Sequence, residues 1–368
     1  MTTLSILDQA PIRQGSTAAE AVREAVQLAQ AADRFGYRRY WLAEHHASGG
    51  LACASPEILI AQIAANTAQI RVGSGGVMLS HYSPLKVAEQ FRMLEALYPG
   101  RIDLGVGRAP GSDGRTAAVL AYGRAGSLED YPEQLEHLSS FLTNSFPADH
   151  PFRGVRAMPE GPTTPELWLL GSTRTSAHYA ARLGWAFSFA QFISPEGGED
   201  VIREYRRNFR PSALLAEPKA SIGVSATCAD TTEEAERLSW SRWYWRVLGN
   251  SDRRGGVPPP EEALAYPYTP AEREYIQYMR GRSVWGDPEQ VQRKLLALGT
   301  QYEVDEFVVL TITHDFAARL RSYQLIAEAF GISAPDPPPG AVGDRLVLDT
   351  RHFPVQAVGT GVGEGNLS

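Results

Sequence analysis

Residues 167–184 read LWLLGSTRTSAHYAARLG, and this stretch contains the unit from which the fold is built. Its first four residues are a continuous apolar run, as in parallel strands that are covered on both faces. The run stops at Gly171, and the hydroxyl residues Ser172, Thr173 and Thr175 open a helical segment that ends at the next glycine. A strand that passes directly into a helix is the repeating unit of α/β proteins.

The same alternation extends along most of the chain and predicts eight strands. They are expected at residues 3–10, 37–43, 70–79, 101–107, 166–171, 185–192, 219–229 and 306–313. Eight strands that each precede a helix are the number in a (β/α)8 TIM barrel. An open doubly wound sheet is the alternative, because it requires no particular number of strands.

The segments between the strands carry helix start and stop signals. Ser16 is the expected cap of a helix that ends before Gly36. A second helix is expected to have Asp287 at its N-cap and Pro288 at its first position, and to end before Gly299.

Two segments do not fit the alternation. Residues 240–286 include WSRWYWRVLG and RRGGVPPPEEALAYPYTP, and they are expected to be an insertion before the last strand. This insertion would be either a wall or lid above the barrel mouth or a packed structural excursion. Residues 332–368 are rich in Pro and Gly and are expected to form a tail, either an arm over a partner subunit or a disordered segment. The barrel domain is therefore expected to comprise residues 1–331.

The composition limits the possible partners. The chain has 368 residues and a net charge of −7, whereas nucleic-acid binding needs a concentrated basic face. No apolar run approaches the ~18 residues that a membrane span requires. The first residues lack the pattern of a secretory signal, and two cysteines, Cys53 and Cys228, provide no disulfide framework. We therefore expect a cytoplasmic protein with neither a nucleic acid nor a membrane as its partner.

In such a barrel the active site lies at the C-terminal ends of the strands. The second predicted strand ends in Glu44-His45-His46. Neighbouring side chains on a strand point to opposite sides, so we expect one imidazole to face the cavity while the other and Glu44 hold the loop. No metal is expected, because zinc needs spaced ligands and the other strand ends carry glycines and hydroxyls. A purely structural cluster of polar groups is the alternative.

The third predicted strand contains VGSGGVML, residues 72–79. Glycine within a strand usually marks a β-bulge or a close approach of a ligand to the backbone. Ser74, Gly75 and Gly76 are therefore candidates to bind a flat ring, which would need the missing Cβ atoms of the two glycines. An ordinary bulge is the alternative.

The fourth predicted strand opens into a glycine turn that carries Arg108. Its sequence, RIDLGVGRAPG, has the wrong glycine spacing for a dinucleotide fingerprint, and the following SDGRTAAV is not expected to form a clean helix. We interpret the turn as one that presents Arg108 to a phosphate.

The fifth predicted strand supplies the second half of this phosphate site. Gly171, Ser172, Thr173 and Thr175 place hydroxyls and free backbone N–H groups at a helix N-terminus, where anions bind. N-capping by Ser172 is an alternative that requires the same geometry. The residues together indicate a phosphorylated, flat-ringed ligand with one or two histidines beside it. No Walker loop, Ser-His-Asp arrangement or NAD(P)-binding unit is recognised, so if a redox cofactor is bound, its electrons would come from another protein.

Five stretches together resemble the bacterial luciferase-like flavin monooxygenases, and most closely the subgroup of MsnO8-type oxidoreductases. They are RRYWLAEHH, IRVGSGGVML, PLKVAEQFRMLEALYPGRIDLGVGRAPG, WLLGST and DEFVVLTITHDFAARLRSYQLIAEAF. The likeness covers residues 3–331. It implies a TIM barrel, usually dimeric, that binds FMN at the C-terminal ends of the strands.

The resemblance also implies roles for individual residues. His45, with His46 beside it, matches the histidine that acts in acid-base chemistry at the flavin. The segment 74–76 matches the strand end against the isoalloxazine, where the family often has a non-proline cis peptide. Arg108 matches a phosphate-binding arginine, Ser172 and Thr175 match phosphate-binding hydroxyls, and Glu89 matches a carboxylate at the subunit interface.

The resemblance implies a monooxygenase that uses reduced FMN as a co-substrate, supplied by a separate flavin reductase. The flavin would react with dioxygen to form a C4a-(hydro)peroxide, which inserts one oxygen atom into a small or medium organic substrate. An F420-dependent hydride-transfer oxidoreductase and a flavin-binding protein without turnover are the alternatives. The chain departs from the subgroup at residues 190–193, which read AQFI in place of ASHF.

Overall fold

The computed structural model describes residues 2–109, 111–122, 130–249 and 255–334. Residues 1–334 belong to one structural unit. The predicted tail lies outside the described residues from position 335 onward.

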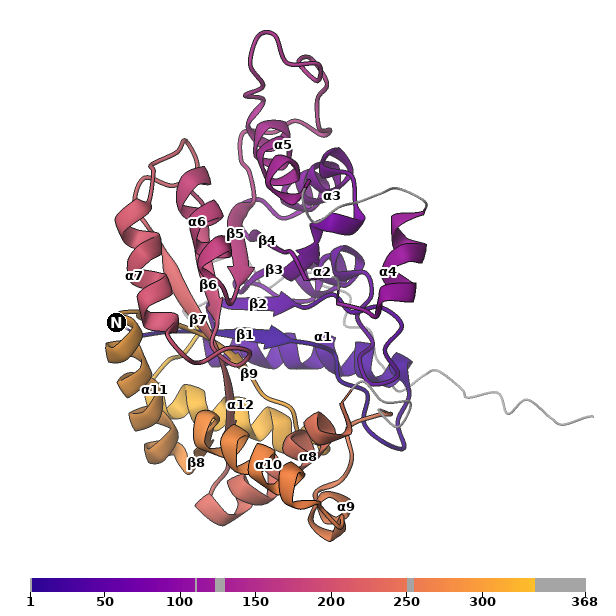
Figure 1. The fold of residues 1–368 in the computed structure, drawn as a ribbon, viewed down its shortest axis with the longest axis vertical. Coiled ribbons are helices and arrows are strands. Elements are labelled where there is room, and N and C mark those ends of the chain that lie inside the picture. Colours follow the sequence, from indigo (N-terminus) through magenta and orange to yellow (C-terminus); the bar gives the residue numbers. More distant parts are fainter. Residues whose placement is uncertain (1, 110, 123–129, 250–254, 335–368) are drawn as a thin grey trace, which may run out of the picture. The chain divides into compact units, whose positions relative to one another are not determined.

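Eight parallel strands of the described chain close into a barrel, which confirms the predicted TIM-barrel fold (Figure 1). They are β1 (Thr3–Asp8), β2 (Arg39–Leu42), β3 (Arg71–Met78), β4 (Ile102–Gly107), β5 (Glu166–Gly171), β6 (Ala186–Ala190), β7 (Ala220–Cys228) and β9 (Glu306–Leu310). Around the barrel they follow the order β6-β5-β4-β3-β2-β1-β9-β7, and the pairing of β6 with β7 closes the ring. Every predicted strand is present, and the boundaries differ by only a few residues.

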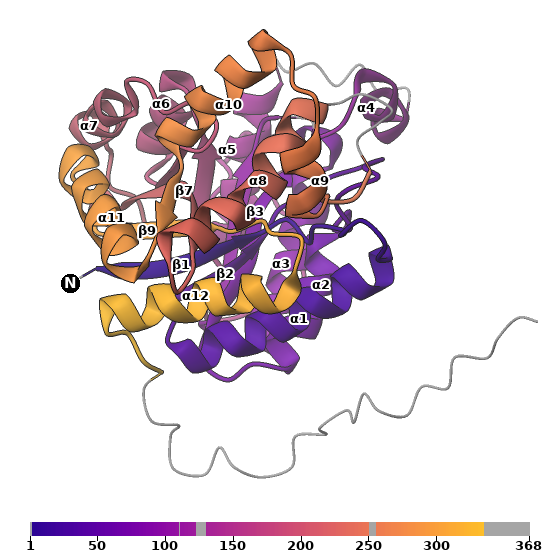
Figure 2. The ribbon, with the colours of Figure 1, turned by 90° about the horizontal axis from the view of Figure 1, so that it is seen from below.

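Helices surround the strands, as Figures 1 and 2 show. They are α1 (Ala18–Phe35), α2 (Pro56–Ala65), α3 (Pro84–Leu97), α4 (Gly114–Ala121), α5 (Tyr131–Thr143), α6 (Arg174–Leu183), α7 (Gly198–Asn208), α8 (Thr232–Leu248), α9 (Pro260–Ala265), α10 (Pro270–Arg282), α11 (Pro288–Tyr302) and α12 (Phe316–Phe330). A short 3-10 helix, η1 (Leu79–His81), follows β3. The main hydrophobic core lies between the outer faces of the strands and these helices.

The helix caps correct three details of the sequence prediction. Thr17, not Ser16, caps α1, and its hydroxyl accepts a hydrogen bond from the Glu20 N–H at 3.2 Å. Thr173, not Ser172, caps α6. The segment SDGRTAAV does form a helix, α4, because the Asp113 carboxylate accepts a hydrogen bond from the backbone of its first turn.

The end of α11 was also predicted wrongly. Asp287 caps this helix as expected, but α11 continues past Gly299 and ends before Glu303, which has a left-handed φ of 55°. Gly299 does not end the helix; it allows close packing between α11 and a neighbouring strand. A Cβ there would lie 2.9 Å from Cζ of Phe307, so the glycine lets α11 approach β9 closely.

A buried ionic network fills the lower interior of the barrel. The Arg39 guanidinium, 1% exposed, lies 2.8 Å from Asp103, 3.1 Å from Glu166 and 2.6 Å from Glu306. The Trp41 indole N–H also donates to Asp103 at 2.9 Å. Because each of these buried charges has a partner of opposite sign, the network avoids the large cost of an unpaired buried ion.

The segment predicted as an insertion begins inside a helix. Helix α8 runs without a break from Thr232, so residue 240 is not a boundary. A short strand, β8 (Val284–Gly286), pairs with the end of β7 and was not predicted. Side chains of α8, α9 and α10 pack into their own core, with Trp243, Tyr244 and Ile276 among its members.

Candidate active site

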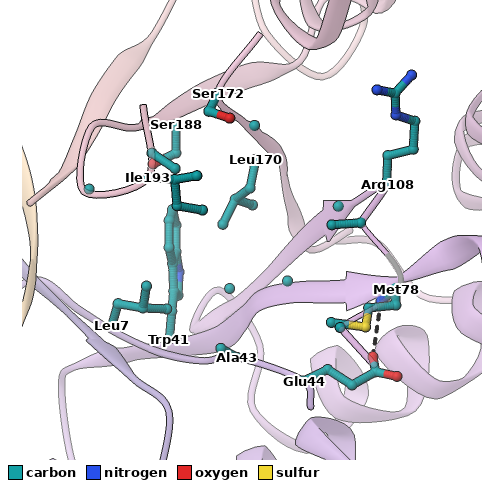
Figure 3. A pocket seen from close by; sticks show the side chains of 18 of the residues that line it. Leu7, Trp41, Ala43, Glu44, Met78, Arg108, Leu170, Ser172, Ser188 and Ile193 are labelled. Atoms are coloured by element: carbon teal, nitrogen blue, oxygen red, sulfur yellow. Dashed lines mark hydrogen bonds between the residues drawn. The ribbon is translucent and has the colours of Figure 1, made fainter. Parts of the chain in front are cut away.

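A pocket of about 410 Å³ lies at the C-terminal ends of the barrel strands (Figure 3). It is lined by residues in or directly after the strands of the closed barrel. They are Leu7, Gln9, Trp41, Ala43, Glu44, His45, Gly75, Gly76, Met78, Gly107, Arg108, Ala109, Gly111, Leu170, Gly171, Ser172, Thr173, Ser176, Ser188, Ala190, Phe192, Ile193, Gly223 and Val308.

Seven of the ten candidate residues line this pocket. They are His45, Gly75, Gly76, Arg108, Gly171, Ser172 and Thr173. The other three, His46, Ser74 and Thr175, are not among the lining residues. Each of these three lies directly beside a residue that does line the pocket.

The glycines of β3 form a strip of bare backbone on the pocket wall. The peptide bond between Gly75 and Gly76 is cis. A Cβ on Gly75 would lie 2.7 Å from Leu7 and 2.9 Å from Trp41, and one on Gly76 would lie 2.8 Å from the Gly105 carbonyl oxygen. The barrel's own packing therefore requires both glycines, and their role in binding a ring stays a prediction.

Ser74 joins two strands and does not face the pocket. Its hydroxyl donates to the Gly105 carbonyl oxygen at 2.7 Å and accepts from the Gly105 N–H at 3.1 Å. The register between β3 and β4 shifts between Gly75 and Val77, so the bulge considered from the sequence is also present. Ser74 anchors the strand just before this bulge.

Glu44 organises the loop after β2. Its buried carboxylate accepts hydrogen bonds from the Met78 N–H at 2.9 Å and the Tyr82 hydroxyl at 2.6 Å, and it lies 2.6 Å from Nε2 of His46. His45 lines the pocket, and its backbone N–H donates to the Cys53 carbonyl oxygen. His46 thus binds Glu44, and His45 is the histidine that lines the pocket; its proposed action on a bound ligand stays a prediction.

The negative charge of Glu44 affects its titratable neighbours. Burial, together with the carboxylates of Asp8 and Glu44, raises the pKa of Cys53 to about 12. Burial and the hydrogen bond to Glu44 also raise the pKa of Tyr82 well above its ordinary value. Both groups therefore stay protonated near neutral pH, and neither supplies a nucleophile.

The ends of β4 and β5 bring a cation and hydroxyls to the same pocket. Arg108 is exposed, and no carboxylate in the described ranges forms an ion pair with it. Ser172, Thr173 and Ser176 lie at the N-terminus of α6, where the Thr173 hydroxyl accepts a hydrogen bond from the Ser176 N–H. Thr175 is on the same helical turn but is exposed outside the pocket. This arrangement suits an anion, because the helix terminus and the guanidinium both favour negative charge.

The rest of the wall comes from β6, β7, β9 and β1 and is largely apolar. Leu7, Phe192, Ile193 and Val308 lie here, and Ser188 supplies a hydroxyl. Figure 3 shows Ser188 and Ile193 on the opposite side of the cavity from Arg108. Residues 190–193, where the sequence AQFI departs from the ASHF of the subgroup, reach this wall in part. Residues 190, 192 and 193 line the pocket, whereas residue 191 does not.

The sequence reasoning missed the residues of this apolar wall and also Gln9, Glu44 and Ser176 as lining residues. Glu44 was predicted only to hold the loop. Ser176 could have been found, because it lies one position beyond Thr175 in the same run of hydroxyl residues.

The donor set fits a flavin nucleotide. Gly75 and Gly76 expose backbone, Arg108 and Ser172 place a cation and a hydroxyl at the ends of other strands, and much of the remaining surface is apolar. Among the described residues, no three His, Cys, Asp or Glu side chains are grouped to hold a metal ion.

The insertion contributes nothing to this wall in the part of the chain that is described. None of the described residues between 240 and 286 lines the pocket.

No helix in the described ranges has the length and apolar character needed to cross a membrane.

Comparison with known proteins identifies the family. Residues 2–302 match the family model described as luciferase-like monooxygenase. The chain is 49% identical to the uncharacterized protein YceB of Bacillus subtilis (strain 168) over 332 residues, which are 90% of this chain and 100% of that protein. It is 40% identical to the N-acetyl-S-alkylcysteine monooxygenase of the same organism, over 89% of this chain and 98% of that one.

A solved structure agrees with both findings. The crystal structure of apo-MsnO8 superposes with a TM-score of 0.83 at 40% identity, and the match covers 90% of this chain and 99% of that one. The resemblance inferred from the sequence motifs is thereby confirmed. The chain is an oxidoreductase enzyme and belongs to the luciferase-like monooxygenase family.

Proposed function

We propose that the protein is a monooxygenase that uses reduced FMN and dioxygen to oxygenate a small or medium organic substrate. One observation carries this proposal: the bare backbone of Gly75 and Gly76, the guanidinium of Arg108 and the hydroxyls at the start of α6 all line one pocket. The flat and the anionic parts of a flavin nucleotide would each find a matching surface there.

Reduced FMN would supply the activation of dioxygen when bound, and the protein would supply position, protons and exclusion of water. His45 lines the pocket and is the candidate to hold or donate a proton, because an imidazole titrates near neutral pH. The apolar wall, with Leu7, Phe192 and Val308, would keep water away from the reacting atoms.

Two partners belong to this proposal. A separate flavin reductase would supply the reduced FMN, since no NAD(P)-binding unit was recognised in the sequence.

A second copy of the chain would pack against α2 and α3, where Ile58, Met93 and Leu97 are all more than half exposed although apolar. Sedimentation velocity tests the dimer: a monomer across the concentration range would contradict it.

The substrate of one relative provides a first compound to assay. N-acetyl-S-alkylcysteines should be tried because the monooxygenase named for them aligns over nearly its whole length. Other candidates are organic molecules of similar size with a reactive heteroatom or carbonyl.

Oxygen uptake and product analysis test the function directly. The purified protein should consume oxygen and release an oxygenated product only when reduced FMN is supplied. Reduced F420 under anaerobic conditions is the comparison, and turnover there would show hydride transfer instead. Flavin binding without any product across a substrate panel would indicate a binding protein.

His45→Ala tests the proposed proton-transfer role. The variant should keep its affinity for FMN and lose product formation by about a hundredfold or more, the usual contribution of general acid-base catalysis. His178→Ala is the matched control, because His178 lies exposed on α6 outside the pocket. Full activity in His45→Ala would exclude the proposed role.

A further inference from the structure

The part of the pocket formed by β6, β7, β9 and β1 contains a buried hydroxyl to which no function has yet been assigned. Ser188 is 4% exposed and lines the pocket from β6. Phe187 and Phe189 point outward into the helix-facing core, so alternation turns Ser188 toward the barrel interior. The other lining residues on this side include the apolar Leu7, Phe192 and Val308 and the neutral amide Gln9.

A second serine fixes the direction in which Ser188 can donate. Ser221 on β7 is its register partner and is 0% exposed, and the Ser221 hydroxyl donates to the Ser188 oxygen at 2.9 Å. The reverse direction would leave the Ser221 hydrogen without an acceptor in the closed interior, which carries a desolvation penalty. The Ser188 hydrogen is therefore the one left over, and no oxygen of the described residues accepts it.

The charge around Ser188 limits what it can bind. The charged side chains that line the pocket, Glu44 and Arg108, follow β2 and β4, and His45 also follows β2. The lining residues from β6, β7, β9 and β1 are all neutral. A carboxylate placed there would lose its hydration and gain one hydrogen bond, whereas a carbonyl oxygen would be satisfied by that bond.

We propose that Ser188 is a specificity-determining residue that donates a hydrogen bond to a neutral acceptor oxygen on an otherwise apolar substrate. Ketone, ester and amide carbonyls are the acceptors of this class. The inference rests on the proposed function, because a flavin along β3, β4 and β5 leaves this part of the pocket to the substrate.

Binding measurements test the proposal without turnover. Isothermal titration calorimetry is performed with the intact protein and oxidised FMN, using linear and cyclic ketones. Each ketone is paired with the hydrocarbon in which a methylene replaces the carbonyl. The ketones should bind about fivefold more tightly than their partners, as expected for one net hydrogen bond.

Three variants separate recognition from stability. Ser188→Ala leaves the Ser221 hydroxyl without an acceptor, so this variant should lose stability as well as the ketone preference. The double variant Ser188→Ala/Ser221→Ala removes both hydroxyls; it should regain stability and still lack the preference. Ser221→Ala is the matched control, which should keep the preference because Ser188 still donates.

The proposal is overturned if the hydrocarbons bind as well as the ketones, if the preference persists in the double variant, or if no ketone binds. Carboxylates that bind more tightly than ketones would overturn the neutral class. These outcomes are independent of turnover, so a failure to oxygenate with reduced FMN would count against the proposed function and leave the ketone preference measurable.

Discussion

Arg108 is the residue on which the proposed nucleotide site depends most. Its guanidinium is exposed at the end of β4, on the pocket wall. Arg108→Gln should raise the dissociation constant of FMN by about tenfold or more, because a hydrogen bond to a charged group contributes about 1.5–3 kcal/mol. Titration calorimetry with FMN and riboflavin checks this.

Riboflavin is the internal control, because it has the same ring and no phosphate. Its affinity should be unchanged in Arg108→Gln. An equal loss for both ligands would mean that the residue shapes the pocket and does not bind phosphate.

Individual site residues could be predicted where a polar or charged side chain follows directly after a predicted strand. His45, Arg108 and Ser172 were found in this way, and all three line the pocket. Ser188 could not be found. Both faces of its strand are buried, so alternation indicates which residues share a face but not which face is the barrel interior.

At the scale of the strand, the glycines of β3 are expected to differ from the glycine at the end of β4. A Cβ on residue 76 would lie 2.8 Å from a backbone carbonyl oxygen, whereas a Cβ on residue 107 would meet nothing within 4 Å. Gly76→Ala should therefore lower the free energy of unfolding by about 1–3 kcal/mol, the usual cost of overpacking. Gly107→Ala should change it by less than about 0.5 kcal/mol.

Urea denaturation of the two variants checks this difference. The comparison is controlled, because both glycines line the same pocket. An equal effect of the two substitutions would contradict the packing role assigned to Gly76.

Strands were predicted well because each has a local physical cause, whereas the predicted caps of α1 and α6 are each one residue too early. Continuous apolar runs mark strands that are buried on both faces, and Asp287 caps its helix as its position implied. A tertiary contact accounts for the wrongly predicted end of α11. Gly299 lies inside α11 because it packs against Phe307, and a local signal cannot reveal a contact with the next strand.

At the scale of the whole molecule, the ionic network inside the barrel makes stability depend on pH. Burial alone would raise the pKa of Glu166, but the positive charges of Arg39, Lys219 and Arg71 outweigh it and lower the pKa to about 2. A depressed folded-state pKa means that the ionised carboxylate stabilises the fold at pH values above about 4.5. This contribution is lost as the pH falls from about 4.5 toward 2.

Glu166→Gln should lower the free energy of unfolding at neutral pH and reduce its dependence on pH in that acidic range. Chemical denaturation at a series of pH values measures both effects. Glu289→Gln, at an exposed position on α11, is the control and should leave the profile unchanged. A variant profile parallel to that of the wild type would show that Glu166 does not contribute to acid sensitivity.

A crystal structure of the protein with bound FMN would show whether this pocket holds the nucleotide as proposed. The ring should lie along the backbone of Gly75 and Gly76, with the phosphate within hydrogen-bond distance of Arg108 and Ser172. A ring bound away from β3, or a phosphate bound away from the ends of β4 and β5, would contradict it.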